Sequence, residues 1–201
     1  MKKIERAARQ LYRLENLIDV IYAITIWRLF MLLPRPKENF EWQSVLQLIS
    51  ENGLRFVFIL IGIIVVIIYW KQNNMLFKYL ERTDNTHITY SILQIFSLLL
   101  FLYAMGLSAR FENDAGARLM ESTMATLMGL LSYLGWRHAI NKGKLLASDI
   151  TDEEKQSIST RIIAEPLTAL ITIFFAFYPK LWEVSWLFYP VAVYYFRRNR
   201  N

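Results

Sequence analysis

The stretch that organises this chain reads RLENLIDVIYAITIWRLFMLLP and covers residues 13–34. It is long and apolar enough to cross a bilayer, since a spanning helix needs about 20 predominantly apolar residues. Yet it carries Glu15, Asp19 and Arg28. A charged side chain at mid-bilayer costs roughly 2.5–3.5 kcal/mol on insertion scales, and such groups usually face a bundle interior or a water-filled path. We therefore interpret this helix as the functional one and the later helices as its support.

The composition indicates a membrane protein. Of the 201 residues, 55% are hydrophobic and 15% aromatic, which exceeds the apolar share of a typical soluble domain. The chain has no Cys and two widely separated His, so disulfides are excluded and a dedicated metal site is not expected. There is no recognisable pairing of a nucleophile with a base and no phosphate-binding Gly loop. An enzyme is therefore the weakest functional class, and no cofactor is expected.

Apolar segments separated by polar connectors predict a single membrane domain over residues 1–201, with six spanning helices. The predicted spans cover about 14–33, 54–70, 87–109, 117–136, 162–178 and 181–196. Residues 38–53 have apolar side chains at helix-like spacing, so we expect a short surface helix there that ends at Gly53. Thr151 and Glu154 fit a capping box, which predicts a helix start directly after Thr151. Pro179 is expected to end the fifth span, because Pro disrupts a helix interior.

The distribution of basic residues predicts the orientation of the chain. Six spans place both termini on one side of the membrane. That side holds sixteen of the 23 Lys and Arg, the opposite side holds six, and Arg28 lies within the first span. Because cytoplasmic loops carry the excess of Lys and Arg, we expect a multi-pass protein of the cell (inner) membrane with both termini in the cytoplasm. This bias also explains the net charge of +6 without invoking nucleic acid.

One side of the first span gathers a distinctive set of residues. At 100° per residue, four side chains lie within about 40° of Ile24 on the helical wheel: Arg13, Leu17, Arg28 and Met31. Asp19 lies about 140° from Ile24, so we expect it to face neighbouring helices. For Arg28 two interpretations remain open. Its guanidinium either points toward a shared axis, or it snorkels to the interface or pairs with another helix.

Several segments resemble the bacterial branch of the transmembrane protein 175 (TMEM175) family, whose members are endosomal and lysosomal potassium channels and their prokaryotic relatives. The resemblance includes IYWKQNNMLFKYLERTD after the second span, ARLMESTMATLMGLLSYLGWRHA in the fourth, and EPLTALITIFFAFYPKLWEVSWLFYPV in the last two. The span order and loop lengths also match over nearly the whole chain. This breadth is more specific than any single motif.

The family signature is only partly kept. The family has an Arg in the first helix, then three residues, then Phe-Ser-Asp; here Arg13 and Asp19 are kept, while Leu17 and Ile18 replace Phe and Ser. The family's Tyr-Trp at the end of the second span is present as Tyr69 and Trp70. The His pair that often follows is replaced by Asn73 and Asn74. A polar network through the Ser and a His therefore cannot form as it does in the family.

The resemblance implies a homotetramer of six-helix subunits in which the first helices line an ion-conducting pore closed by large aliphatic side chains. The matching positions in this chain are Ile24, Arg28 and Met31, with Leu17 on the same side of the helix. The middle position departs from the family, which has an aliphatic residue where this chain has Arg28. The implied partners are the lipid bilayer, further copies of the chain, and a permeant ion, potassium or another.

Two alternatives stay open beside a potassium-channel-like pore. In the first, Arg28 makes a pore that passes anions or is plugged by an anionic ligand such as a nucleotide or oligonucleotide, and the protein acts as a membrane-depolarising stress or defence effector. In the second, the chain is a non-conducting membrane scaffold that keeps the fold and has lost the pore.

Overall fold

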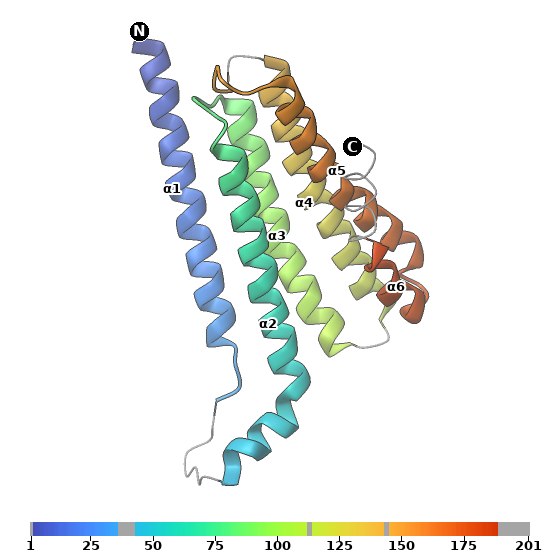
Figure 1. Ribbon diagram of the computed structural model, residues 1–201. Coiled ribbons are helices and arrows are strands. Elements are labelled where there is room, and N and C mark those ends of the chain that lie inside the picture. The colour runs from blue at the N-terminus through green and yellow to red at the C-terminus, as the bar shows by residue number, and fades with distance from the viewer. Residues whose placement is uncertain (1, 36–42, 112–113, 143–144, 189–201) are drawn as a thin grey trace.

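The protein is an all-α membrane protein, as the sequence predicts. The computed structural model describes residues 2–35, 43–111, 114–142 and 145–188. Its helices are α1 (Lys2–Met31), α2 (Gln43–Phe77), α3 (Asn85–Arg110), α4 (Ala115–Lys142), α5 (Asp152–Phe175) and α6 (Pro179–Ser185). Helices α1 to α5 run alternately in opposite directions, and α1 stands at one edge of the bundle (Figure 1). Among the described residues, β-structure is limited to one bridge between Leu80 and Leu146.

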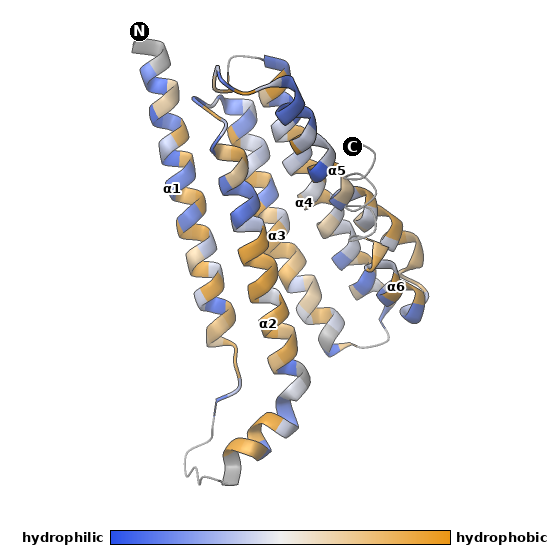
Figure 2. Cartoon of the chain, viewed as in Figure 1, coloured by the Kyte–Doolittle hydropathy of each residue, from blue (hydrophilic) through white to orange (hydrophobic). Residues whose placement is uncertain are grey.

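Three helices of the described chain are long and apolar enough to cross a membrane. These segments are Arg55–Phe77, Asn85–Ser108 and Asp152–Phe175. Figure 2 shows hydrophobic colouring concentrated along the middle of α2, and hydrophilic colouring at the beginning of α5. The count of six spans stays a prediction, and half of the predicted last span, residues 189–196, lies outside the described residues.

Two helix boundaries differ from the sequence-based expectation. The surface helix does not end at Gly53; α2 continues through it with a kink at Asn52, whose φ of −118° and ψ of 16° are non-helical. Nor does α2 end near Trp70: it runs two turns further because Leu76 and Phe77 are buried in the core. Part of the predicted polar connector is therefore helical.

Side chains at the helix starts explain where α3, α5 and α6 begin. The predicted capping box is confirmed, since the Glu154 backbone N–H donates to Thr151 Oγ1 and the Thr151 N–H donates to the Glu154 carboxylate. The carboxylate of Asp84 caps α3 and lies 2.9 Å from His138 Nε2. Burial raises the pKa of Asp84, but the hydrogen bonds from the His87 backbone and His138 outweigh it and leave the pKa below its usual value. Pro179 begins α6, where Pro is tolerated in the first turn.

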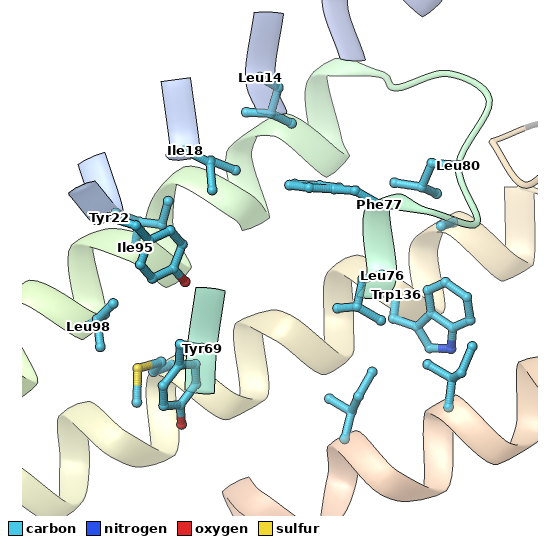
Figure 3. Close-up of a cluster of buried hydrophobic side chains, with 14 of the residues drawn as sticks. Leu14, Ile18, Tyr22, Tyr69, Leu76, Phe77, Leu80, Ile95, Leu98 and Trp136 are labelled. Atoms are coloured by element: carbon cyan, nitrogen blue, oxygen red, sulfur yellow. The ribbon is translucent and has the colours of Figure 1, made fainter. Parts of the chain in front are cut away.

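The core forms where α1 to α5 meet. Figure 3 shows the cluster, with side chains contributed by α1, by α2 and the turn after it, and by α3, α4 and α5. Its labelled members are Leu14, Ile18, Tyr22, Tyr69, Leu76, Phe77, Leu80, Ile95, Leu98 and Trp136. On α1 the buried positions recur every three or four residues, which is the spacing of one helix face.

Helices α4 and α5 approach closely at small residues. A Cβ added at Gly129 would lie 3.0 Å from the backbone nitrogen of Pro166 and 2.8 Å from its Cδ. Near the other end of this contact, Ser122 Oγ accepts hydrogen bonds of 2.8 Å from Thr172 Oγ1 and from Trp182 Nε1, which joins α4, α5 and α6. The small and hydroxyl residues of α4 therefore serve helix packing, as is typical in lipid.

Candidate functional site: the uncovered face of α1

The predicted pore residues lie on a face of α1 that the other described residues leave uncovered. Leu17, Ile24 and Met31 are 48%, 53% and 41% exposed, and Arg28 is exposed beside them. The opposite face packs against the bundle through a stripe of residues at or below 8% exposure: Leu11, Leu14, Ile18, Tyr22 and Thr25. One side of α1 thus holds it in the fold, and the other side is free to meet lipid or another chain.

The uncovered face is apolar well beyond the four predicted pore positions. Val20, Trp27 and Phe30 are also more than half exposed. A helix with apolar residues around most of its circumference must be covered by a partner or by lipid, because such surface is unfavourable in water. The four predicted positions occupy one sector of this face, so the remaining exposed residues can contact neighbouring copies or the bilayer.

Arg28 lines an open hollow near the end of α1. The hollow measures about 530 Å³, and Arg35 and Arg55 line it as well. The apolar segment of α2 begins at Arg55. Arg28 therefore shares a level with the end of the apolar span, where its charge costs less than at mid-bilayer. Arg28 therefore lies near the end of the uncovered face of α1, and Ile24 lies one helical turn further from that end.

Two of the signature residues meet through a hydrogen bond between α1 and α2. Trp70 Nε1 donates to Asp19 Oδ1 over 2.8 Å, which agrees with the expectation that Asp19 faces a neighbouring helix. Tyr69, the neighbour of Trp70, is 8% exposed and belongs to the core. Arg13 is exposed on α1, two turns before the Asp19 contact. Of the kept signature residues, Asp19 and Trp70 thus join α1 to α2.

Sequence reasoning missed a second polar contact between the same helices. Asn73 Nδ2 donates to the hydroxyl of Tyr22 over 2.8 Å, and both residues are buried. Asn73 stands where the family often has a His. The replacement of that His by a smaller amide, opposite a Tyr on the buried stripe of α1, was the available signal. A different polar link therefore joins α1 and α2 in this chain.

A separate internal cavity lies among α2, α3, α4 and α5. It measures about 230 Å³ and is almost entirely apolar, with Glu165 as its one acidic lining residue. The Glu165 carboxylate accepts a hydrogen bond of 3.5 Å from Gln72, and its second oxygen is buried without a partner in the described structure. No α1 residue of the described chain lines this cavity, so it is not part of the uncovered face.

Comparison with known proteins finds one family model that matches part of the chain. The family model of the endosomal/lysosomal potassium channel TMEM175 matches residues 13–101, from α1 into α3. The match covers 89 of the 201 residues, so the chain resembles this family over its first half. No curated protein matches it.

Two solved structures of the TMEM175 family share the fold. One is a homologue from Chamaesiphon minutus, titled a lysosomal potassium-selective channel homologue, with a TM-score of 0.70 and 16% identity; the match covers 96% of this chain and all of that one. The other is a variant of the potassium channel MtTMEM175 bound to a nanobody fusion, with a TM-score of 0.73 and 16% identity over 92% and 91% of the two chains. Both solved structures carry titles that describe potassium channels or a homologue of one, and what they share with this chain is the fold.

Proposed function

We propose that four copies of this chain surround an ion-conducting pore lined by α1. The observation that carries the proposal is the one-sided packing of α1: Leu17, Ile24 and Met31 lie on a face that no other helix of the described chain covers. A pore formed by one helix from each subunit needs such a face. Rings of large aliphatic side chains close a pore by excluding water, which fits Ile24 and Met31.

Arg28 sets the expected ion preference. Two like charges ~8 Å apart repel by about 2 kcal/mol at an effective dielectric constant of 20, and Arg stays protonated because its pKa exceeds 12. Four guanidinium groups near one end of the pore would therefore oppose potassium and favour anions. The hollow that Arg28 shares with Arg35 and Arg55 supports the second candidate, a pore that passes anions or is blocked by an anionic ligand.

Recording from purified protein in planar bilayers under a potassium chloride gradient tests both candidates. Arg28→Leu should shift the reversal potential toward that of potassium, since a change of about 1 kcal/mol in ion energy alters a permeability ratio roughly fivefold. Arg110→Leu is the matched control, because Arg110 is exposed at the end of α3 and lies outside α1.

The number of subunits is measured on the same sample. The protein mass of the assembly in native conditions should be four times the 23.8 kDa of one chain. An unchanged reversal potential in intact Arg28→Leu tetramers would remove Arg28 from the pore and leave the pore itself standing. Intact wild-type tetramers without any current would instead favour the non-conducting scaffold, and a stable monomer would count against both tetramer and pore.

A further inference from the structure

Three guanidinium groups line one hollow at the end of α1. Arg28, Arg35 and Arg55 come from the end of α1, the segment after it and the start of the apolar part of α2. Among the described lining residues there is no carboxylate, and the only polar contact that these three side chains make within the described structure joins Arg35 Nη2 to Met31 Sδ at 3.3 Å. Like charges gathered in this way repel, so the hollow is suited to an anion.

An apolar groove continues from this hollow between α1 and α3. The groove measures about 390 Å³, and its apolar lining includes Ile24, Leu29, Leu32, Leu99 and Leu102. Arg28 and Leu32 line both the hollow and the groove, so the two are contiguous. Thr25 also lines the groove, but its hydroxyl already donates to the backbone of Ile21 over 2.7 Å. The combined site is therefore cationic at one end and apolar along its length.

We propose that this site binds an anionic phospholipid of the surrounding bilayer. The headgroup phosphate lies in the hollow against Arg28, Arg35 and Arg55, and an acyl chain lies in the groove between α1 and α3. Guanidinium groups are the preferred partners of phosphate because their planar donors bind two oxygens at once. The depth fits as well, since Arg55 marks the level where the apolar span of α2 begins.

Other occupants satisfy only part of the site. A soluble anion would fill the hollow and leave the groove apolar and empty, and a zwitterionic lipid would leave a net positive charge uncompensated. An apolar helix from a second copy would cover the groove and bury three guanidinium groups without partners, which is unfavourable. Only a ligand with both an anionic head and an apolar tail matches charge and surface together.

Lipid retention tests the proposal without any recording of current, so its failure is separable from failure of the pore. The protein is purified from vesicles of equimolar phosphatidylglycerol and phosphatidylcholine, and bound lipid is counted by native mass spectrometry. Wild type should retain phosphatidylglycerol in preference to phosphatidylcholine. The combined change Arg28→Gln, Arg35→Gln and Arg55→Gln should reduce that retention at least tenfold, while Arg110→Gln leaves it unchanged.

A second pair of variants tests the groove independently of charge. Leu99 lines the groove and is 41% exposed, whereas Leu93 is 45% exposed and lies about 120° away around α3. Leu99→Trp should fill the groove and displace the lipid, and Leu93→Trp should not. Three results would overturn the proposal. Both lipids could be retained equally, or retention could be unchanged in the triple Gln variant. Alternatively, inorganic phosphate could displace the bound lipid while Leu99→Trp has no effect. A tetramer that Leu99→Trp dissociates without changing lipid retention would also overturn the proposal, because a second copy would then occupy the groove.

Discussion

At the scale of single residues, two polar contacts fix α1 against α2. Trp70 donates to Asp19 on the surface of the helix pair, and Asn73 donates to Tyr22 in its interior. In a membrane protein such contacts fix the relative rotation of two helices, because apolar side chains alone pack equally well against lipid. The rotation matters here, since it decides which face of α1 stays uncovered.

The buried contact can be tested with a matched pair of Tyr variants. Tyr22→Phe removes the acceptor of the Asn73 side chain and should lower the free energy of unfolding by about 1 kcal/mol, within the measured range for interhelical bonds in membranes. Tyr12→Phe is the control, since Tyr12 is 65% exposed on the same helix. Thermal unfolding of both variants in detergent would show the difference, and an equal effect of the two would deny the contact any role in stability.

The sequence predicted that Asp19 faces a neighbouring helix, but it did not predict the contact between Asn73 and Tyr22. The angular position of Asp19 on the helix predicted that it faces a neighbour, because helix geometry is fixed by residue number alone. The partner of Asn73 depends on the register between α1 and α2. That register is set by three-dimensional packing of Leu76, Phe77 and Tyr22, which no pattern within one helix contains.

At the scale of helices, α4 and α5 approach each other closely at Gly129. Gly129 meets Pro166 so tightly that even a methyl group would lie within 3.0 Å of backbone. The Cδ and Cβ atoms of the Pro166 ring would lie 2.8 and 3.2 Å from that methyl group, so the proline ring occupies the space that a side chain at position 129 would need. The absence of a side chain on Gly129 therefore allows the two helices to pack.

Two glycine variants with opposite expected signs test this contact. Gly129→Ala should destabilise the protein by about 1–3 kcal/mol, as overpacking of a tight contact does. Gly106→Ala should be neutral or stabilising by up to about 1 kcal/mol, because nothing lies within 4 Å of its added Cβ and Ala favours the helix. Chemical or thermal unfolding measures both. Equal destabilisation would mean that the proximity of Gly129 and Pro166 carries no special cost.

Helix boundaries show where local signals suffice. The start of α5 was predictable because Thr151 and Glu154 complete a cap within four residues of each other. The end of α2 was not, since Lys71, Gln72 and Asn73 read as a connector although they continue the helix. Tertiary packing of Leu76 and Phe77 extends α2 through these polar residues. Asn73 finds its partner on α1, which removes the cost of burying its amide.

At the scale of the whole molecule, α1 is the least enclosed of the long helices. It contacts α2 and α3 along one face and stands at the edge of the bundle (Figure 1). The apolar surface that it leaves uncovered is the natural place for assembly and for a pore along a shared axis. The lipid proposed between α1 and α3 would neutralise Arg28 at the end of that surface, and so couple the charge of the pore mouth to the surrounding bilayer.

Thiol modification at Ile24 tests the central claim, that α1 lines the pore. The chain contains no Cys, so Ile24→Cys places one thiol in each subunit, on α1, and Phe174→Cys places one in each subunit on α5, where Phe174 is 72% exposed. A bulky, uncharged methanethiosulfonate reagent applied during bilayer recording should reduce the current of Ile24→Cys channels by narrowing the pore and leave Phe174→Cys channels unaffected. Complete labelling of Ile24→Cys, verified by mass spectrometry, with an unchanged current would contradict the account.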